Sequence, residues 1–239
     1  ITSVKSREIA PDELVTIVLL CDSPGYRMKS YGAIPLIPFK TKRLIDIQIN
    51  NITKIFKNVE IILCVGYDSE KVCKYVKNKY RNINIRIVEN QMFNKCNSSE
   101  GVRLCLNNIN NDKIIIIDGS LLIHSQTFKS LDRKKSGIFI EAFKNEDLEI
   151  GVNIGDKNTI EYFGFGASQI WSEIIFLNSH DIIEALRKLL SAQEHKTRFF
   201  FEILNDLIRT KYNLEAISNK HPVQKMSNIK TYHKLRGTL

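Results

Sequence analysis

The stretch Thr16–Phe39, TIVLLCDSPGYRMKSYGAIPLIPF, decides how this chain folds. It opens with an apolar, β-branched run of the kind that forms a buried strand. The run ends in a loop that holds Asp22, Ser23 and Gly25, and Arg27 follows. A buried strand leading into a glycine-containing loop is typical of the ligand-binding edge of an open α/β sheet. Backbone N–H groups and a guanidinium there suit phosphate oxygens, although an ordinary turn is an open alternative.

The composition is that of a globular protein with room for a core. The chain has 239 residues, of which 43% are hydrophobic and 26% charged. Its 35 Lys and Arg against 26 Asp and Glu give a net charge of +9. This balance favours anionic partners, namely nucleotides, phosphorylated small molecules, nucleic acid or acidic protein subunits, and it equally fits a solvated basic surface. No apolar run reaches the length of a membrane span, so we expect a cytoplasmic protein with no membrane partner.

The cysteines and histidines show no ligand spacing. The five cysteines form no C-x-x-C pair, and Cys21 and Cys64 lie in apolar runs, where they are expected to act as small core residues. We expect a reducing compartment, without a disulfide framework or a zinc site. No histidine is paired with Cys or Asp at ligand spacing, so none is assigned a metal or general-base role.

Apolar runs alternate with helical patterns through the first half of the chain. The expected strands are Leu14–Cys21, Glu60–Val65, Ile83–Ile87 and Ile114–Ile117. The expected helices between them are Leu44–Phe56, Ser69–Lys77 and one that starts at Ser98 or Ser99 and carries Val102, Leu104, Cys105 and Leu106. This alternating order predicts an α/β fold: a mixed, mostly parallel sheet with helices on both faces, of the Rossmann-like type.

The pattern changes in the second half. Short strands are expected at Gly137–Ala142, Glu149–Ile154, Thr159–Phe165 and Glu173–Leu177. Two helices, Asp181–Ala192 and Phe199–Tyr212, and a last strand at Leu214–Ile217 follow. Residues 1–13 are polar and predict an N-terminal arm. No linker divides the remainder, so residues 14–239 are expected to form a single domain.

The ordered set of motifs resembles the nucleotidyltransferase family that activates sugar phosphates or phosphocholine and has a GT-A-like fold. That family leads from its first strand into A-A-G-x-G-x-R-M and then P-K-P-L-x-P, and Cys21–Met28 and Ala33–Pro38 are similar here. Further similar segments are Val65–Tyr67, Asn90–Ser99, Asp118–Ser120 (D-G-D in the family) and Gly166–Trp171. The resemblance covers about Val15 to Ile229.

The resemblance implies a reaction and a set of site residues. A phosphate or phosphonate oxygen of the acceptor attacks the α-phosphate of a nucleoside triphosphate, and pyrophosphate leaves, with a lysine and Mg²⁺ neutralising the charge. The residues implied for nucleotide binding are Asp22, Ser23, Gly25, Arg27, Asn97 and Ser99. Those implied for binding the acceptor are Gln169 and Trp171. Asp118 and Arg27 are implied for catalysis, and Asp118 is also implied as the metal ligand. The alternatives are structural: a strand-end cap at Asp118, a helix start at Ser98–Glu100 and a core position for Trp171.

The sequence departs from the family pattern at the charged positions. Ile34 stands at the lysine position, Ser120 at the last position of D-G-D, and Ser227 at the second acidic position of a C-terminal segment, Lys225–Asn228. Serine gives a divalent cation no charge, and isoleucine cannot neutralise phosphate. These losses predict a catalytically degenerate member in which Mg²⁺ binds poorly.

Three functions follow as hypotheses. A degenerate nucleotidyltransferase-like domain would serve as a binding or structural part of a larger assembly. An active nucleotidyltransferase would need Asp118, Asp22 and a nearby lysine to converge. A basic nucleic-acid-binding module would explain the charge, but no recognition motif of such modules is present.

Overall fold

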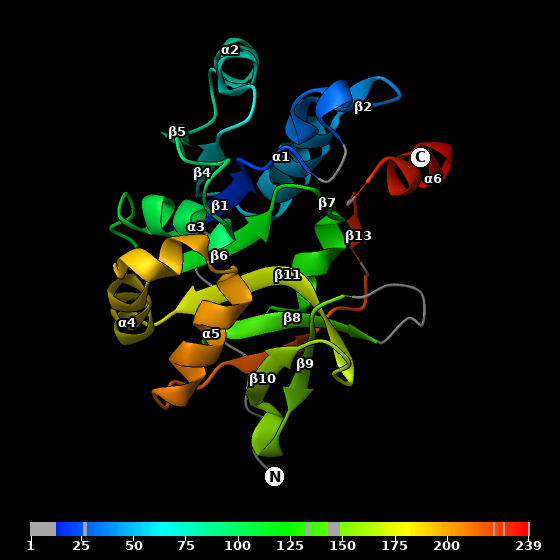
Figure 1. The fold of residues 1–239 in the computed structure, drawn as a ribbon. Coiled ribbons are helices and arrows are strands. Elements are labelled where there is room, and N and C mark those ends of the chain that lie inside the picture. The colour runs from blue at the N-terminus through cyan, green and yellow to red at the C-terminus, as the bar shows by residue number, and fades with distance from the viewer. Residues whose placement is uncertain are drawn as a thin grey trace.

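The protein was analysed as a computed structural model that describes residues 13–25, 28–131, 134–142, 149–221, 223–226 and 228–238. A sheet of nine strands runs through it, in the order β10-β9-β11-β6-β1-β4-β5, with β8 pairing with β11 and β12 with β8 (Figure 1). The strands are β1 Val15–Cys21, β4 Val59–Val65, β5 Ile85–Glu89, β6 Lys113–Asp118, β8 Gly137–Ala142, β9 Gly151–Ile154, β10 Ile160–Gly164, β11 Gln169–Asn178 and β12 Glu215–Ser218. The predicted N-terminal arm lies outside the described residues except for Glu13.

Six α-helices and two small ribbons complete the described part of the chain. The helices are α1 Leu44–Ile55, α2 Ser69–Lys79, α3 Ser98–Leu106, α4 His180–Leu190, α5 Phe200–Arg209 and α6 Ile229–Thr238. One ribbon pairs β2 Pro38–Phe39 with β3 Lys42–Arg43, and the other pairs β7 Leu121–Leu122 with β13 Gln224–Lys225. Short 3-10 turns occupy Lys29–Tyr31, Ile34–Leu36, Ser125–Ser130, Asp156–Asn158 and Gln193–Thr197.

The first strand is central, as its apolar sequence predicts. β1 lies between β4 and β6 and is parallel to both, with Val18 opposite Ile62 on one side and Ile116 on the other. All three side chains are buried. The chain passes from β1 to β4 and β5 on one side of the sheet and later returns as β6 on the other side. The carboxyl ends of β1 and β6 therefore meet at the point where the strand order reverses, where open α/β sheets bind ligands.

Strand direction confirms the predicted mixed, mostly parallel sheet. Among the nine strands, β10 and β11 run opposite to the other seven. β11 is longer than the predicted strand Glu173–Leu177, because it continues past β6 to pair with β8 and β9. A β-bulge between Trp171 and Ile175 interrupts the alternation of buried residues, which is why the sequence pattern identified only its second half.

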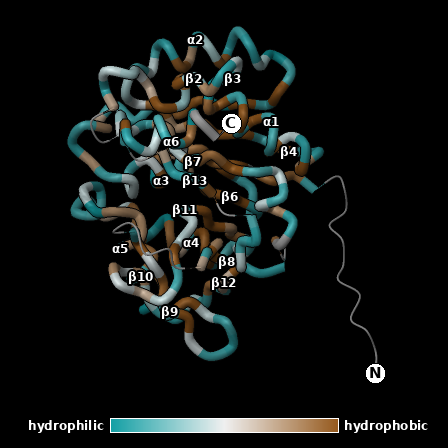
Figure 2. The backbone as a smooth tube through the Cα atoms, turned by 90° about the vertical axis from the view of Figure 1, so that its right-hand side faces the viewer, coloured by the Kyte–Doolittle hydropathy of each residue, from teal (hydrophilic) through white to brown (hydrophobic). Residues whose placement is uncertain are grey.

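Helices cover both faces of the sheet, as predicted. One face carries α3, α4 and α5, which pack through residues such as Val102, Leu186 and Leu204. The other face carries α1 and α2, packing through residues such as Ile49 and Val72. The hydrophobic segments of the chain gather around the strands, and many outer loops are hydrophilic (Figure 2). These two buried layers account for the buried positions of Cys21 and Cys64, and all five cysteines are free thiols.

Helix α6 was not predicted from the sequence. Its apolar residues Tyr232 and Leu235 pack against Met28, Phe39 and Leu44, which form a third, smaller cluster. Only a few widely spaced apolar positions mark this helix in an otherwise basic segment, so no helical face stood out. Within the described part of the chain, no helix combines the length and the apolar content needed to cross a membrane.

Candidate phosphate-binding cleft

A cleft of about 240 Å³ opens at the carboxyl ends of β1 and β6. Its lining comes from the β1 end and loop, from the β6 end, and from the chain around β13: Leu20, Cys21, Ser23, Gly25, Ile34, Asp118, Gly119, Ser120, Lys225 and Met226. Three of the predicted site residues, Ser23, Gly25 and Asp118, are thus brought together here. Ile34 and Ser120, two of the three positions that depart from the family pattern, line the same cleft.

The loop after β1 is shaped by a glycine. Gly25 has φ +70°, and a Cβ on it would lie 2.5 Å from Cδ1 of Ile34, so neither the backbone nor the space suits a larger residue. The N–H of Gly25 donates to Oγ of Ser23 over 3.2 Å. Ile34 itself is buried and forms part of the cleft wall. Arg27, predicted for phosphate binding and catalysis, lies outside the described residues, and its role stays a prediction.

Asp22 is buried and joins two loops. The Nδ2 of Asn90, just after β5, donates to Oδ2 of Asp22 over 2.7 Å, and the N–H of Tyr67 donates to the Asp22 carbonyl over 3.0 Å. Burial raises the pKa of the Asp22 carboxyl above its usual value, and the hydrogen bond from Asn90 opposes that rise. The Asp22 carboxylate is turned toward Asn90 and Gly101, so it anchors the loop.

The turn after β6 is closed by its own hydrogen bonds. Both the backbone N–H and the hydroxyl of Ser120 donate to Oδ1 of Asp118, over 2.8 and 2.5 Å. From α1, Nε2 of Gln48 donates to the carbonyls of Gly119 and Leu121 over 3.1 and 2.8 Å. A Cβ on Gly119 would lie 2.4 Å from the Leu20 carbonyl oxygen, so this position requires glycine. Asp118 is therefore held in place beside the end of β1.

Two residues that sequence reasoning did not assign to the site complete it. Ile174 of β11 is opposite Ile117 of β6, so the preceding residue, Glu173, falls beside Asp118. Lys225 of β13 is paired with Leu121 of β7, and its side chain forms an ion pair with Glu173. In the sequence, the one signal that could have identified Glu173 is its position as an acidic residue at the start of an apolar strand. Lys225 was noted only as part of the C-terminal segment.

The titration of this pair reflects its surroundings. Burial and the nearby Asp118 raise the pKa of Glu173 to about 7, and Lys225 partly offsets the rise. Burial alone would lower the pKa of Lys225, but the carboxylates of Glu173 and Asp118 raise it above its usual value. The ammonium of Lys225 therefore stays charged and compensates two acidic groups.

The residues present do not fit a Mg²⁺ site. Among the described residues, no group of three or more His, Cys, Asp and Glu side chains is placed to hold a metal ion. Asp118 accepts two hydrogen bonds from Ser120, and Glu173 is already paired with an ammonium. Ser227 lies outside the described residues. A hard divalent cation prefers several oxygen ligands with net negative charge. Here the ammonium of Lys225 already neutralises the negative charge of Glu173.

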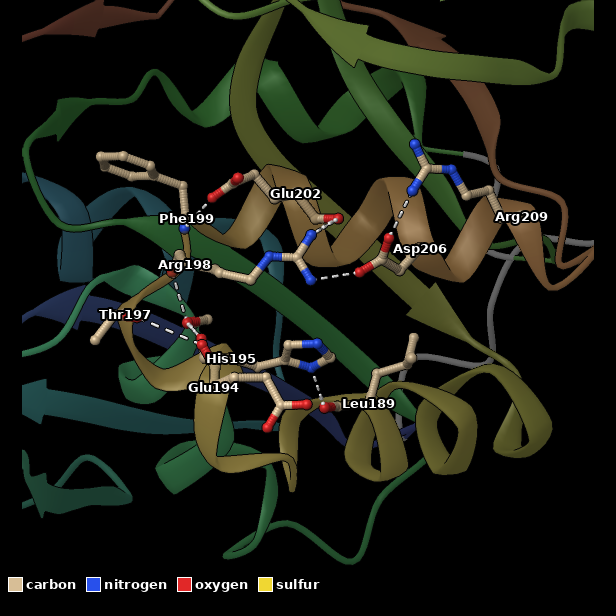
Figure 3. A network of polar contacts seen from close by, with 10 residues as sticks. Leu189, Glu194, His195, Thr197, Arg198, Phe199, Glu202, Asp206 and Arg209 are labelled. Atoms are coloured by element: carbon tan, nitrogen blue, oxygen red, sulfur yellow. Dashed lines mark hydrogen bonds and ion pairs between the residues drawn. The ribbon is translucent and has the colours of Figure 1, made fainter.

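Asn97 and Ser99, predicted for nucleotide binding, hold a neighbouring segment. The Nδ2 of Asn97 donates to the Thr197 carbonyl over 2.5 Å, and Oγ of Ser99 donates to the carbonyls of His195 and Arg198 over 2.5 and 2.7 Å. In Figure 3 this segment leads into α5, where Arg198 reaches Asp206. The start of α3 thus binds the backbone that precedes α5.

Gln169 and Trp171 lie on the part of β11 that extends past β6. The indole N–H of Trp171 donates to the Ile174 carbonyl over 3.3 Å, and its ring packs edge-on against Phe163 with centroids 5.3 Å apart. Trp171 is half-buried against the core, while Gln169 is paired with Ala142 of β8 and is also half-buried. Their predicted contact with an acceptor stays a prediction.

A second, basic groove of about 580 Å³ lies along α2, outside the cleft. Its lining is Leu36, Arg43, Lys71, Lys74, Tyr75, Asn78 and Lys79. Arg43 stacks over the ring of Tyr75 at 4.1 Å, Lys71 pairs with Asp68, and Lys79 pairs with the buried Asp46. Much of the positive charge of this groove is therefore balanced within the chain.

Comparison with solved structures identifies the fold. The chain is similar to the CTP:phosphocholine cytidylyltransferase of Streptococcus pneumoniae, with TM-score 0.76 and 19% identity over 94% of this chain and 98% of the other. It is similar to the inositol-1-phosphate CTP transferase of T. maritima, with TM-score 0.76 and 12% identity over 94% and 95%. A nucleoside-diphosphate-sugar pyrophosphorylase of Vibrio cholerae matches with TM-score 0.73 and 11% identity over 93% and 100%.

Sequence comparisons add no relative: no family model matches the chain, and no curated protein matches it. At these identities the structural likeness shows the fold alone, and that fold is the Rossmann-like architecture of the nucleotidyltransferases. The predicted fold class is thereby confirmed over nearly the whole chain.

Proposed function

We propose that this chain is a nucleotide-binding domain of nucleotidyltransferase fold that has lost most or all of its transferase activity. The observation that carries the proposal is the lining of the cleft: Gly25 and Gly119 keep it open, while Ile34 and Ser120 leave it without the lysine and the carboxylate that the family resemblance implies. These residues supply a scaffold for a phosphate ligand without the lysine and the second carboxylate that the resemblance assigns to phosphoryl transfer.

Phosphate binding is supported by the position and backbone of the β1 loop. The cleft lies where the strand order reverses, which is the usual ligand site of such sheets. The 3.2 Å bond from the Gly25 N–H to Ser23 is long, and a phosphate oxygen can replace it. We propose a nucleoside triphosphate as the ligand, with Ser23 and Gly25 contacting its phosphates and Arg27 as a second contact.

The remaining partners follow from the same resemblance. A phosphorylated small molecule would lie toward Gln169 and Trp171, on the extension of β11 past β6. A degenerate domain of this kind is expected to act by binding or by contributing to a larger assembly, so we propose other protein subunits as partners.

The proposal is tested by titrating each of the four nucleoside triphosphates into the protein in a calorimeter. Gly25→Ala should weaken binding at least tenfold, because its Cβ would collide with Ile34 and reshape the loop. Gly166→Ala is the matched control: Gly166 also has positive φ (+73°), but its Cβ would have nothing within 4 Å. It should bind as the wild type does. Failure of all four nucleotides to bind the wild type would refute the proposal.

A second candidate, an active nucleotidyltransferase with relocated groups, is favoured by one observation. Asp118, Glu173 and Lys225 gather at one end of the cleft, and such a cluster supplies both charges that phosphoryl transfer uses. Pyrophosphate release, measured over a panel of phosphosugars and phosphocholine, separates the two candidates. The degenerate domain should release none above background, whereas steady turnover would establish the active enzyme.

A further inference from the structure

We propose that the ammonium of Lys225 is a built-in cation that fills the place of a divalent metal at the end of β6 and excludes such a metal from the cleft. A nucleotide would then bind this chain without a bridging divalent ion, a consequence that rests on the proposed function. The exclusion itself does not, because it concerns only side chains of this chain.

The first support is the placement of Glu173. This residue has φ 54° inside the bulge of β11, a left-handed conformation that is strained for residues other than glycine. The bulge re-aims the side chain, so that Glu173 faces Asp118 and Lys225. Its side chain is only 21% exposed. A strained backbone that directs a carboxylate to a lysine of the cleft lining indicates a site whose charges are arranged for binding.

The second support is the rigid position of Lys225. Its backbone is tied to the β6 turn by the pairing of β13 with β7, and the N–H of Met226 donates to the Ser120 carbonyl over 3.0 Å. Gln48 of α1 also holds this turn, because its side-chain amide donates hydrogen bonds to two of the backbone carbonyls there. The β13–β7 pairing therefore holds the ammonium of Lys225 beside Glu173, although the two residues are 52 positions apart in the sequence.

The third support is charge balance. Two carboxylates side by side in a partly dry cleft repel one another and require a positive neighbour. Lys225 supplies that neighbour from within the chain, without the entropy cost of recruiting an ion, and Glu149 adds further negative charge near the pair. A divalent cation could enter only by breaking the ion pair with Glu173 and displacing Ser120 from Asp118. The site is therefore closed to metal by its own side chains.

The direct test measures Mn²⁺ binding by electron paramagnetic resonance, with no nucleotide present. The wild type should bind no Mn²⁺ in the low millimolar range. Lys225→Met removes the ammonium but leaves Asp118 and Glu173 in place, so Mn²⁺ affinity should rise at least tenfold. In Glu173→Gln with Lys225→Met the gain should disappear. Lys79→Met is the matched control, since Lys79 pairs with the buried carboxylate of Asp46 without a second carboxylate beside it, and it should gain nothing.

The outcomes separate this inference from the proposed function. Tight Mn²⁺ binding by the wild type at a site lost in Glu173→Gln would overturn the inference, and this measurement needs no lysine variant to fold. An unchanged Mn²⁺ affinity in a folded Lys225→Met protein would overturn it as well. In the second arm, calorimetry with a nucleoside triphosphate in EDTA and in Mg²⁺ should give affinities within about threefold. Binding that requires Mg²⁺ would contradict the inference and leave the nucleotide-binding proposal intact.

Discussion

The side-chain amide of Asn90 donates a hydrogen bond of 2.7 Å to the buried carboxylate of Asp22, and so joins the loop after β5 to the loop after β1. Both residues are at most 8% exposed. Asp22 belongs to the loop after β1 that we propose binds phosphate. It places a carboxylate where the family resemblance has a small apolar residue, and it makes the shape of the cleft depend on a buried polar pair.

Asn90→Ala should therefore destabilise the protein. The variant leaves the buried Asp22 carboxylate without its amide donor, and loss of a hydrogen bond to a buried charged group costs about 2–3 kcal/mol. Denaturant unfolding measures the change. Asn108→Ala is the control, because Asn108 is exposed and its amide only donates to Leu104 within one helical turn. A loss in Asn90→Ala no larger than in the control would show that Asp22 gains little from this contact.

Ser99→Ala should loosen the segment that precedes α5. The hydroxyl of Ser99 donates to the carbonyls of both His195 and Arg198, and its removal should cost about 1–2 kcal/mol. The effect should be local, so amide hydrogen exchange in residues 193–199 should speed up before the rest of the protein responds. Ser191→Ala, whose hydroxyl contacts only Lys188 in its own helix turn, should leave those amides unchanged. Uniform acceleration in both variants would contradict this role for Ser99.

Glu173 predicts a pH dependence of stability with a definite sign. Its pKa is raised from 4.5 to about 7 by burial, so the unfolded chain ionises first as pH increases. The stability that Glu173 contributes is full below pH 4.5 and is lost as pH rises through 7. Between these values the free energy of unfolding of the wild type should fall relative to Glu173→Gln by up to about 3 kcal/mol, since one pKa unit corresponds to about 1.4 kcal/mol and solvent screens part of the effect.

Unfolding both proteins in denaturant at pH 5, 6, 7 and 8 measures this difference. Above pH 8 the two curves should run parallel, because the group is then ionised in both states. A difference that stays constant from pH 5 to pH 8 would show that Glu173 titrates near its ordinary value. It would also mean that Lys225 fully offsets the rise in the pKa of Glu173 that burial and Asp118 cause.

The sequence identifies the parallel half of the fold because its information there is local. Short, β-branched runs such as Ile114–Ile117 favour buried strands, and the helices between them have clear apolar faces. The short loop from Asp22 to Gly25 was likewise recognisable from its residues. Helix α6 and the first part of β11 escaped prediction because their patterns are sparse or interrupted by the bulge.

The charge arrangement of the cleft could not be predicted for a different reason. The Glu173–Lys225 ion pair joins residues 52 positions apart, and nothing local to either residue indicates the other. Asp22 shows the same limit, because its partner Asn90 is 68 positions away. Residue type suggested that Asp22 might face phosphate. The structure shows that the Asp22 carboxylate accepts a hydrogen bond from Asn90 and so joins the two loops.

From the proposed loss of a lysine and a carboxylate in the cleft, we expect that three changes together restore part of the transferase activity. Ile34→Lys introduces a cation into the cleft wall, and Ser120→Asp introduces a carboxylate beside Asp118. With Lys225 still present, its ammonium would pair with the new carboxylate, so we expect no pyrophosphate release from this double variant. Adding Lys225→Met frees the acidic groups for Mg²⁺, and both charges then act on the transition state.

We therefore expect weak, Mg²⁺-dependent pyrophosphate release from the triple variant alone, measured with nucleoside triphosphate and a panel of phosphosugars and phosphocholine. Ser120→Asp with Lys225→Met is the control. It should bind Mn²⁺ but release no pyrophosphate, because a metal without the lysine leaves the phosphates only partly neutralised. The rate should stay low even in the triple variant, since Pro24 removes one N–H from the phosphate-binding loop. Equal release by the double and triple variants would show that Lys225 does not keep metal out of the cleft.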